Sequence, residues 1–186
     1  TEDGKVPPDN PFVNTAGARP EIWSYGIRNP QGMAMNPWSD ALWLNEHGPR
    51  GGDEINIPEK GKNYGWPMAT HGINYSGLKI PEAKGEHVEG TEKPLFVWKV
   101  SPAVSGMAFY NSDVFPQWKN KLFIGALKEK DVIVLSVKGN TVTEDGRILG
   151  DKDHRIRDVR VGPDGYLYVL TDETDGQLWK VSPSGS

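Results

Sequence analysis

Residues 156–171 read IRDVRVGPDGYLYVLT, two runs of β-branched and aromatic residues around the turn Gly-Pro-Asp-Gly. Such runs favour short strands, whereas Pro followed by Asp-Gly favours a tight reversal between them. The same order of apolar strand, turn rich in Asn, Gly and Asp, and aromatic-aliphatic strand recurs at 32–44 and, with a longer loop, at 106–124. We therefore expect about three related units of unequal length.

Helical periodicity is scarce because Gly, Pro and Asn interrupt most windows long enough to show it. Short runs typical of strands dominate the chain. They lie at 21–25, 32–35, 41–44, 54–57, 95–98, 104–110, 121–125, 132–137, 156–161, 166–171 and 177–181. The prediction is an all-β fold.

A second recurrence concerns a short polar motif. Thr1-Glu2-Asp3-Gly4-Lys5 is echoed by the sequence Thr-Glu-Asp-Gly-Arg at 143–147. An Asp-Gly pair between strands is typical of a type I′ hairpin, so we expect a hairpin turn at 145–146 and, by analogy, a hairpin tip at 1–5. Repeats of roughly 40–50 residues with four short strands are typical of β-propeller blades.

Composition excludes several classes of protein. The chain has 186 residues, 21 Lys plus Arg, 25 Asp plus Glu, a net charge of −4 and no Cys. An acidic balance argues against a nucleic-acid partner, because such affinity comes mainly from Lys and Arg. Without Cys there are no disulfides or thiolate zinc sites, and no apolar run is long enough to predict a membrane span. The length predicts one domain.

Residues 26–67 are crowded with Gly, Pro, Asn, Arg and carboxylates, the composition of functional loops on a rigid scaffold. Asp53 and Glu54 lie between Gly-rich loops that could turn backbone carbonyls inward. Calcium prefers 6–8 oxygen ligands of these kinds. The alternative is a pair of solvated acidic residues, and no EF-hand spacing is present.

Basic residues stand near several predicted strand ends: Arg28, Lys128, Arg155 and Arg157. Arg155 and Arg157 are two residues apart, so they face the same side of an extended chain. Convergent cations of this kind predict a small anionic ligand, and this interpretation requires them to gather in one pocket. The alternative for Arg155 is an ordinary surface charge ladder with its neighbouring aspartates.

The histidines and tryptophans leave alternatives open. His47 could be a base or a ligand, whereas the other three histidines have no partner at catalytic or zinc spacing. The seven tryptophans could stack on sugars, but in a propeller an aromatic residue on a strand is more often part of the blade core.

Four ordered motifs carry a family resemblance: Gly-Ile-Arg-Asn-Pro-Gln-Gly from 26, Glu-His-Gly-Pro from 46, Gly-Asp-Glu-Ile-Asn from 52 and Gly-Lys-Asn-Tyr-Gly-Trp-Pro from 61. They resemble the soluble quinoprotein glucose and sorbosone dehydrogenases, most closely the bacterial periplasmic aldose sugar dehydrogenases. The resemblance implies a six-bladed β-propeller of about twice this length. It implies that residues 1–186 form its C-terminal half, about three blades of a single propeller domain without a linker domain.

The resemblance also implies pyrroloquinoline quinone and calcium as cofactors, and roles for individual residues. Arg28 matches a residue that polarises the quinone carbonyl. The other implied cofactor contacts are Asn29, Gln31, Tyr75, Ala126, Leu127, Lys128, Arg155, Ile156, Arg157 and Asp172. The implied calcium residues are Gly48 and Pro49 at the site that holds the quinone, and Glu54, Tyr64 and the neighbouring Asp53 at a second site. Pyrroloquinoline quinone is a tricarboxylate, so the basic residues would have anions to meet.

The implied function is oxidation of aldose sugars to lactones, with hydride transfer to the quinone and onward transfer to a separate electron acceptor in the periplasm. The family's histidine base precedes the Arg-Asn-Pro motif, and no residue here aligns with it, so we expect the isolated chain to be inactive or nearly so. We also expect exposed blade edges to associate with the N-terminal half of the propeller or with each other. The alternative class is a non-catalytic propeller module that binds a sugar or a protein.

Overall fold

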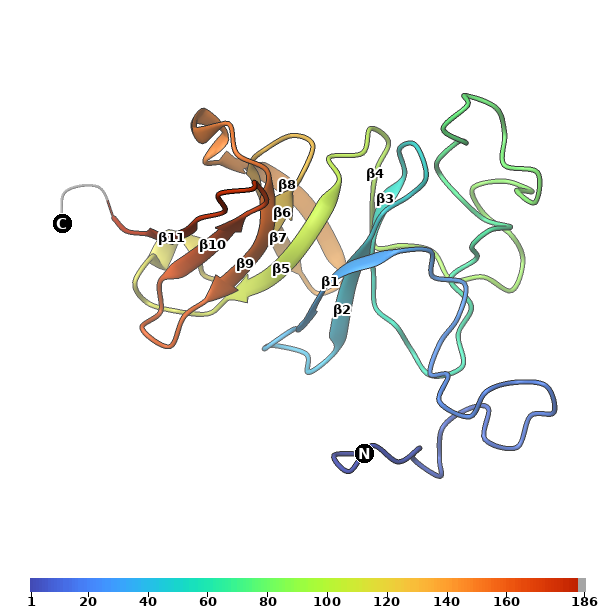
Figure 1. Ribbon diagram of the computed structural model, residues 1–186. Coiled ribbons are helices and arrows are strands. Elements are labelled where there is room, and N and C mark those ends of the chain that lie inside the picture. Colours follow the sequence, from blue (N-terminus) through green and yellow to red (C-terminus); the bar gives the residue numbers. More distant parts are fainter. Residues whose placement is uncertain (184–186) are drawn as a thin grey trace.

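The computed structural model describes residues 1–183 and contains eleven strands and two short 3₁₀ helices (Figure 1). The strands are β1 (Pro30–Met35), β2 (Leu42–Glu46), β3 (Asp53–Asn56), β4 (Phe96–Trp98), β5 (Val104–Tyr110), β6 (Lys121–Ala126), β7 (Val132–Lys138), β8 (Thr141–Ile148), β9 (Ile156–Val161), β10 (Leu167–Thr171) and β11 (Leu178–Val181). The 3₁₀ helices are η1 (Pro116–Trp118) and η2 (Gly150–Lys152). None of the helices in this part of the chain has the length and apolarity to span a bilayer.

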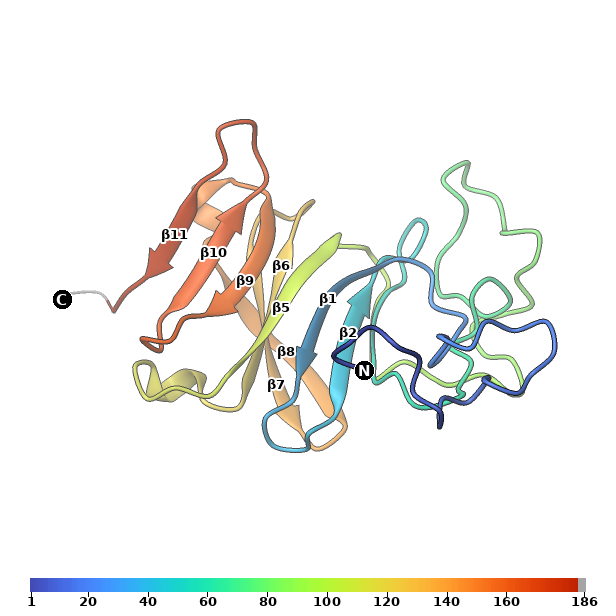
Figure 2. The same ribbon diagram turned by 60° about the horizontal axis from the view of Figure 1, so that its bottom comes forward.

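The strands form three separate antiparallel sheets, each of which follows chain order. The sheets are β1-β2-β3-β4, β5-β6-β7-β8 and β9-β10-β11. The first strands β1, β5 and β9 lie next to one another, and the sheets fan out from them (Figures 1 and 2). Meandering sheets arranged around their first strands are blades of a β-propeller. The predictions of an all-β fold and of about three blades are confirmed.

Glycines permit the close approach of the first strands. A Cβ on Gly32 in β1 would lie 2.5 Å from the carbonyl oxygen of Ser105 in β5. A Cβ on Gly106 in β5 would lie 2.7 Å from the Cα of Asp158 in β9. Backbone atoms cannot move aside as a flexible side chain can, so only glycine fits at these two positions.

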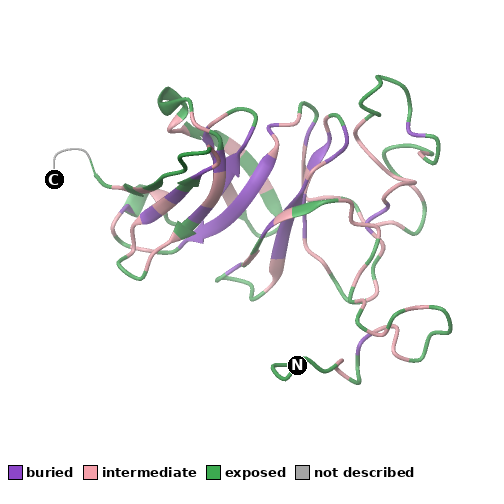
Figure 3. Ribbon diagram, viewed as in Figure 1, coloured by how far each residue is buried: buried purple, intermediate pink, exposed green. Residues whose placement is uncertain are grey.

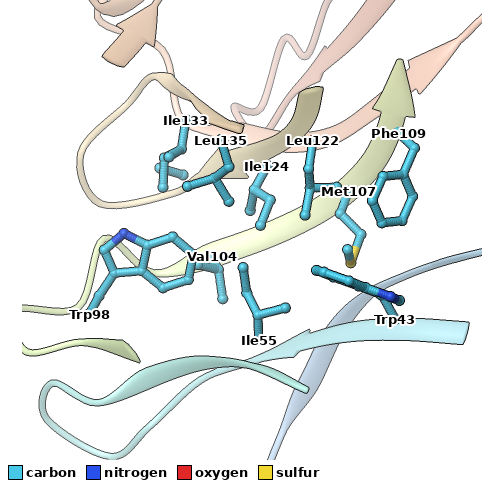
Figure 4. Packing of buried hydrophobic residues seen from close by; sticks show 11 residues of the cluster. Trp43, Ile55, Trp98, Val104, Met107, Phe109, Leu122, Ile124, Ile133 and Leu135 are labelled. Carbon is cyan, nitrogen blue, oxygen red and sulfur yellow. The ribbon is translucent and has the colours of Figure 1, made fainter. Parts of the chain in front are cut away.

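Two apolar clusters fill the spaces between neighbouring blades. Figure 4 shows Trp43 and Ile55 of the first blade facing Met107, Leu122 and other residues of the second. The second cluster lies between the second and third blades and includes Phe123 and Val169. Burial is accordingly concentrated in the middle strands rather than in the long loops (Figure 3). The interpretation of tryptophan as blade core holds for Trp43, which is fully buried, and not for Trp23 and Trp38, which are exposed.

The polar echo at 143–147 does not form a hairpin. Residues 141–148 form the continuous strand β8, which the sequence-based list missed. The pairing with β7 shifts register between Val134 and Leu135, so that Asp145 is the extra residue of a bulge. Its carboxylate accepts hydrogen bonds from Lys121 and Ser136 on neighbouring strands. Residues 1–5 instead form an exposed turn closed by the Gly4 N–H and the Thr1 carbonyl, so the two copies differ in structure.

One further strand prediction was wrong. Residues 21–25 form no strand, and only Tyr25 makes an isolated bridge, to Asn63. Here the backbone follows the segment that joins β3 to β4, which covers the outer end of the first blade in Figure 1. Backbone hydrogen bonds link residues 23–26 to residues 61–66, but they include only one bridge and do not build the continuous ladder of a strand pair.

Candidate functional site

Loops from all three blades meet at one end of the propeller. In an antiparallel meander the start of the first strand lies beside the end of the second strand. Residues 47–52, 99–103, 127–131 and 172–177, together with those just before β1 and β9, therefore share this end. The first three loops lie along the top of Figure 1.

Three hydrogen bonds join the blades directly beneath these loops. The Asn45 side chain donates to the carbonyl of Ser105 at 2.8 Å, and the Ser105 hydroxyl donates to the carbonyl of Ile156 at 2.7 Å. His47 Nε2 lies 2.6 Å from the carbonyl oxygen of Val104. These contacts fix the positions of neighbouring blades relative to one another at this end of the propeller. His47 belongs to the first blade and contacts the second.

A groove of about 760 Å³ runs between the loops of the first and second blades. Its walls come from residues 47–51, 73–77, 99–103 and Lys128. Tyr75, which is 71% exposed, and Ile73 both line the groove. Arg50, Lys99 and Lys128 add three cations to the lining. The groove thus combines an aromatic wall with positive charge, which suits a flat anionic molecule.

Arg28 lies beside the groove rather than in its lining. One guanidinium nitrogen donates to the carbonyls of His47 and Gly48, each at 3.1 Å, and the guanidinium lies 5.2 Å from the ring centre of Trp66. It lines a small adjoining cavity, which also contains Glu54 and Tyr64. His47 and Gly48 line both spaces, so the two residues whose carbonyls accept from Arg28 also form part of the groove. The amides of Asn29 and Gln31 bond to each other at 3.0 Å at the start of β1.

Asp172 holds the two arginines that the sequence placed on one side of a strand. Its carboxylate accepts from Arg155 at 3.0 Å and from Arg157 at 2.9 Å. The hydrogen bond from Arg157 lowers the pKa of Asp172, and that from Arg155 acts in the same direction. Neither arginine pairs with the aspartates next to it in sequence, so the ladder of neighbouring charges suggested for Arg155 is wrong.

These arginines also stand outside the groove lining, although close to it. Arg155 lies 3.4 Å from the carbonyl of Leu127, the residue before Lys128. Ala126 and Ile156 are buried at the neighbouring strand ends. Of the four basic residues expected to converge, only Lys128 lines the groove itself. The other three lie at the same end of the propeller without lining the groove, so the expected convergence of all four in one pocket is not observed.

Two carboxylates face each other in the small cavity. Glu46 at the end of β2 lies opposite Glu54 in the register of β2 and β3. The Asn56 side-chain amide donates to both carboxylates, at 3.0 and 3.4 Å. Burial raises the pKa of Glu46. Burial, followed by the negative charge of Glu46, raises the pKa of Glu54 to about 8. Two facing carboxylates with raised pKa values favour a proton or a cation between them.

Asp53 differs from Glu54 because its own hydrogen bonds are already made. It is fully buried and accepts from Gly48 N–H at 3.1 Å, Ser101 Oγ at 2.7 Å and Val104 N–H at 3.1 Å. The alternative of a solvated acid is therefore wrong for Asp53. Its carboxylate joins the loops of the first two blades.

The cavity residues give a test of whether calcium would fit. Within residues 1–183 no three His, Asp or Glu side chains are grouped for a metal, so backbone oxygens would have to contribute. The adjoining cavity is lined by Gly48 and Tyr64, two of the expected carbonyl donors, and Pro49 lines the groove. The Asn56 side-chain oxygen is buried without a partner in this part of the chain. Oxygen donors and facing carboxylates suit a hard cation.

Sequence reasoning missed Glu46, Asn56, Arg50 and Lys99. Glu46 stood inside a quoted motif, directly after a predicted strand and before a Gly-rich loop. A carboxylate at such a strand end is a signal that could have singled it out. Lys99 and Arg50 carry no comparable signal, because loop cations are usually solvated.

The chain is a set of propeller blades with a groove lined by three cations and an acidic cavity at one end. Residues 1–180 match the model of the Glucose / Sorbosone dehydrogenase family. The chain belongs to this family.

Named relatives agree with this assignment. Over 183 residues the chain is 79% identical to Aldose sugar dehydrogenase YliI of Escherichia coli strain K12, covering 98% of this chain and 49% of the relative. It is 29% identical over 231 residues to Quinoprotein glucose dehydrogenase B of Acinetobacter calcoaceticus, covering 96% and 48%. The chain thus spans about half the length of these curated relatives.

Solved structures show the same fold. The apo-form of the soluble aldose sugar dehydrogenase from Escherichia coli superposes with a TM-score of 0.97 at 79% identity, over 98% of this chain and 53% of that one. The PQQ-bound form of an aldose sugar dehydrogenase from Streptomyces coelicolor superposes with a TM-score of 0.71 at 26% identity, over 97% and 49%.

Proposed function

We propose that this chain is part of a quinoprotein that oxidises aldose sugars to lactones. The observation that carries the proposal is the groove at the loop end of the blades, with Tyr75 on one wall and Lys128 on the other. Family membership and the PQQ-bound relative supply the ligand class, pyrroloquinoline quinone. When bound, this group would supply the acceptor for the two electrons that leave the sugar.

The residues of the chain would bind and orient this tricarboxylate. Lys128, Arg155 and Arg157 would meet its carboxylates, with Asp172 holding the two guanidiniums in place. Tyr75 would cover a face of the ring system. Arg28 would present positive charge to a quinone oxygen, and its contacts with the carbonyls of His47 and Gly48 keep it beside the groove. Asn29, Gln31 and the residues around Ala126 and Ile156 would complete the surroundings.

Calcium would be the second cofactor in this proposal. The carbonyls of Gly48 and Pro49 would hold the ion that contacts the quinone. Glu54 and the Tyr64 carbonyl would hold a second ion, in the cavity where the facing carboxylates gather. Asp53 would act as a neighbour that supports the loop, because its oxygens already accept three hydrogen bonds.

We also propose that the three blades belong to one six-bladed propeller domain whose other half supplies the histidine base. His47 would not replace this base, since its Nε2 contacts the Val104 carbonyl. The acceptor would be a separate molecule and the compartment the periplasm. The exposed side chains Leu170 and Leu178 on the third blade would then be covered by the rest of the propeller or by a second copy.

Reconstitution tests the proposal. The full-length protein is titrated with pyrroloquinoline quinone in the presence of calcium, and reduction of an artificial dye is followed with a panel of aldoses. We expect sugar-dependent dye reduction that requires the quinone, and none from residues 1–186 alone. Sugar binding without dye reduction in the full-length protein would instead identify a non-catalytic module. Robust turnover by residues 1–186 would show that the base lies within this chain.

A further inference from the structure

Glu46 accepts hydrogen bonds from two backbone N–H groups of another segment and from one side-chain amide. One carboxylate oxygen, Oε2, accepts from the backbone N–H of Arg28 at 2.6 Å and from that of Asn29 at 3.4 Å. The other oxygen, Oε1, accepts from the Asn56 amide at 3.0 Å. The side chain is only 5% exposed, so water is not a ready substitute for these partners.

These bonds fix the backbone just before β1. Arg28 and Asn29 precede the first residue of that strand and do not pair within the sheet. Without Glu46 the N–H of the half-buried Arg28 would lose an acceptor at 2.6 Å, and that of the exposed Asn29 would lose a longer contact at 3.4 Å. A backbone donor away from water is costly to leave unpaired, so the larger effect falls on Arg28. The carbonyl of Asn29 would still accept from the His47 N–H at 3.0 Å, so the backbone on the Arg28 side would be the less restrained part.

The position of the backbone decides where the Arg28 guanidinium lies. With the backbone held by Glu46, this side chain reaches the carbonyls of His47 and Gly48, in the loop that directly follows Glu46. The Glu46 carboxylate thus accepts from the backbone N–H of Arg28, and the two carbonyls accept from its guanidinium. A single strand end, that of β2, supplies all three acceptors.

We propose that Glu46 is a positioning residue that holds Arg28 and Asn29 in place for the anionic ligand of the groove. This rests on the proposed function for the identity of the ligand, although the hold on the backbone does not. Glu46 touches no ligand itself in this proposal. It acts by fixing the orientation of Arg28 and Asn29, which would contact the ligand.

The test compares Glu46→Ala with Glu46→Gln in the full-length protein. Glu46→Gln keeps an acceptor of the same length, whereas Glu46→Ala removes it. We expect the dissociation constant for pyrroloquinoline quinone to rise about tenfold in Glu46→Ala and to stay within about threefold of wild type in Glu46→Gln. The double variant Arg28→Ala/Glu46→Ala is expected to lose less affinity than the sum of the two single losses, because part of the effect of Glu46 acts through Arg28 and the rest through Asn29.

Amide hydrogen exchange of a peptide spanning 26–33 provides a readout that needs no ligand. Exchange is expected to accelerate in Glu46→Ala and to remain at the wild-type rate in Glu46→Gln. Glu144→Ala is the matched control, because the half-buried Glu144 also accepts a hydrogen bond, from Trp98 Nε1 at 2.8 Å, but lies on the outer strand β8. It should lose stability without changing exchange at 26–33 or ligand affinity.

The outcomes separate the two proposals. Wild-type affinity together with wild-type exchange in Glu46→Ala would overturn the role of Glu46, as would losses that add in the double variant. If the wild-type protein fails to bind pyrroloquinoline quinone, the proposed function is wrong, and hydrogen exchange alone then decides whether Glu46 holds Arg28 and Asn29.

Discussion

Glu46 and Glu54 stand directly opposite each other on β2 and β3, and a single amide, that of Asn56, donates to both. Like charges at such a pair destabilise a sheet. Burial and the charge of Glu46 together raise the pKa of Glu54 to about 8. A proton at low pH would relieve the cost of this arrangement, and a bound cation would relieve it at high pH.

Stability of the metal-free protein should fall as pH rises from about 4.5 to about 8. Glu54 in the unfolded chain loses its proton near its ordinary value of 4.5, whereas in the folded chain it keeps the proton up to about 8. The folded state therefore binds more protons across this window, and the free energy of unfolding decreases there, by a few kcal/mol at most. Urea unfolding at several pH values, with calcium chelated, measures the effect.

Calcium should counteract this loss. We expect added calcium to raise the melting temperature clearly at pH 8 and little at pH 5, because only ionised carboxylates bind the ion. Glu54→Gln should flatten the pH dependence and remove most of the calcium effect. Glu89→Gln, an exposed glutamate, is the control and should change neither. An undiminished calcium shift in Glu54→Gln would place the ion elsewhere.

Loss of the Asp53 carboxylate should weaken the joint between the first two blades. Asp53→Ala leaves two buried N–H groups and the Ser101 hydroxyl without their acceptor, at a cost of about 3 kcal/mol. Ser101→Ala removes one of the three partners of Asp53, together with the acceptor of the Ala103 N–H, and should cost about 1–2 kcal/mol. Asp113→Ala, on an exposed pair with Lys119, should be neutral. Equal unfolding midpoints for Asp53→Ala and Asp113→Ala would contradict this role.

Arg155 and Arg157 should matter for the anionic ligand, and Arg160 on the same strand should not. Arg157→Ala removes a charge near the groove, whereas Arg160→Ala removes one that faces the other side of β9 and pairs with Asp158. We expect Arg155→Ala and Arg157→Ala each to weaken binding of pyrroloquinoline quinone about tenfold. This difference should shrink at high salt, because screening weakens exposed charges. Equal affinities for the Arg157 and Arg160 variants would place the ligand away from β9.

Gly106→Ala tests the close approach of the first strands. The added methyl would meet the Asp158 backbone, so β5 and β9 would have to separate, at a cost of about 2 kcal/mol in the free energy of unfolding. Gly146→Ala is the matched control, since its Cβ would point into open space and its change should be within about 0.5 kcal/mol. A tolerant Gly106→Ala would mean that the blades can move apart freely.

Much of the fold is visible in local pattern. The predicted bounds of β5 and β9 agree with the structure residue for residue, because an alternating or continuous apolar run between turn residues specifies a strand whatever its partners are. The echo at 143–147 shows the limit. Asp145 and Gly146 carry the signature of a turn, yet a full partner strand, β7, and the hydrogen bonds of Asp145 with Lys121 and Ser136 hold them in a bulged strand.

The candidate site divides in the same way. The motifs that contain Arg28, Glu54 and Tyr64 identified the family and the loops that carry chemistry, since residue type and spacing are properties of the chain. Whether a charged side chain is buried, and which distant group forms its ion pair or hydrogen bond, depends on which strand ends lie side by side. Arg155 and Arg157 could be placed on one side of a strand from their spacing, but their common partner Asp172 arrives from the next strand. Glu46 acquires its contact with Arg28 only because antiparallel pairing brings the end of β2 beside the start of β1.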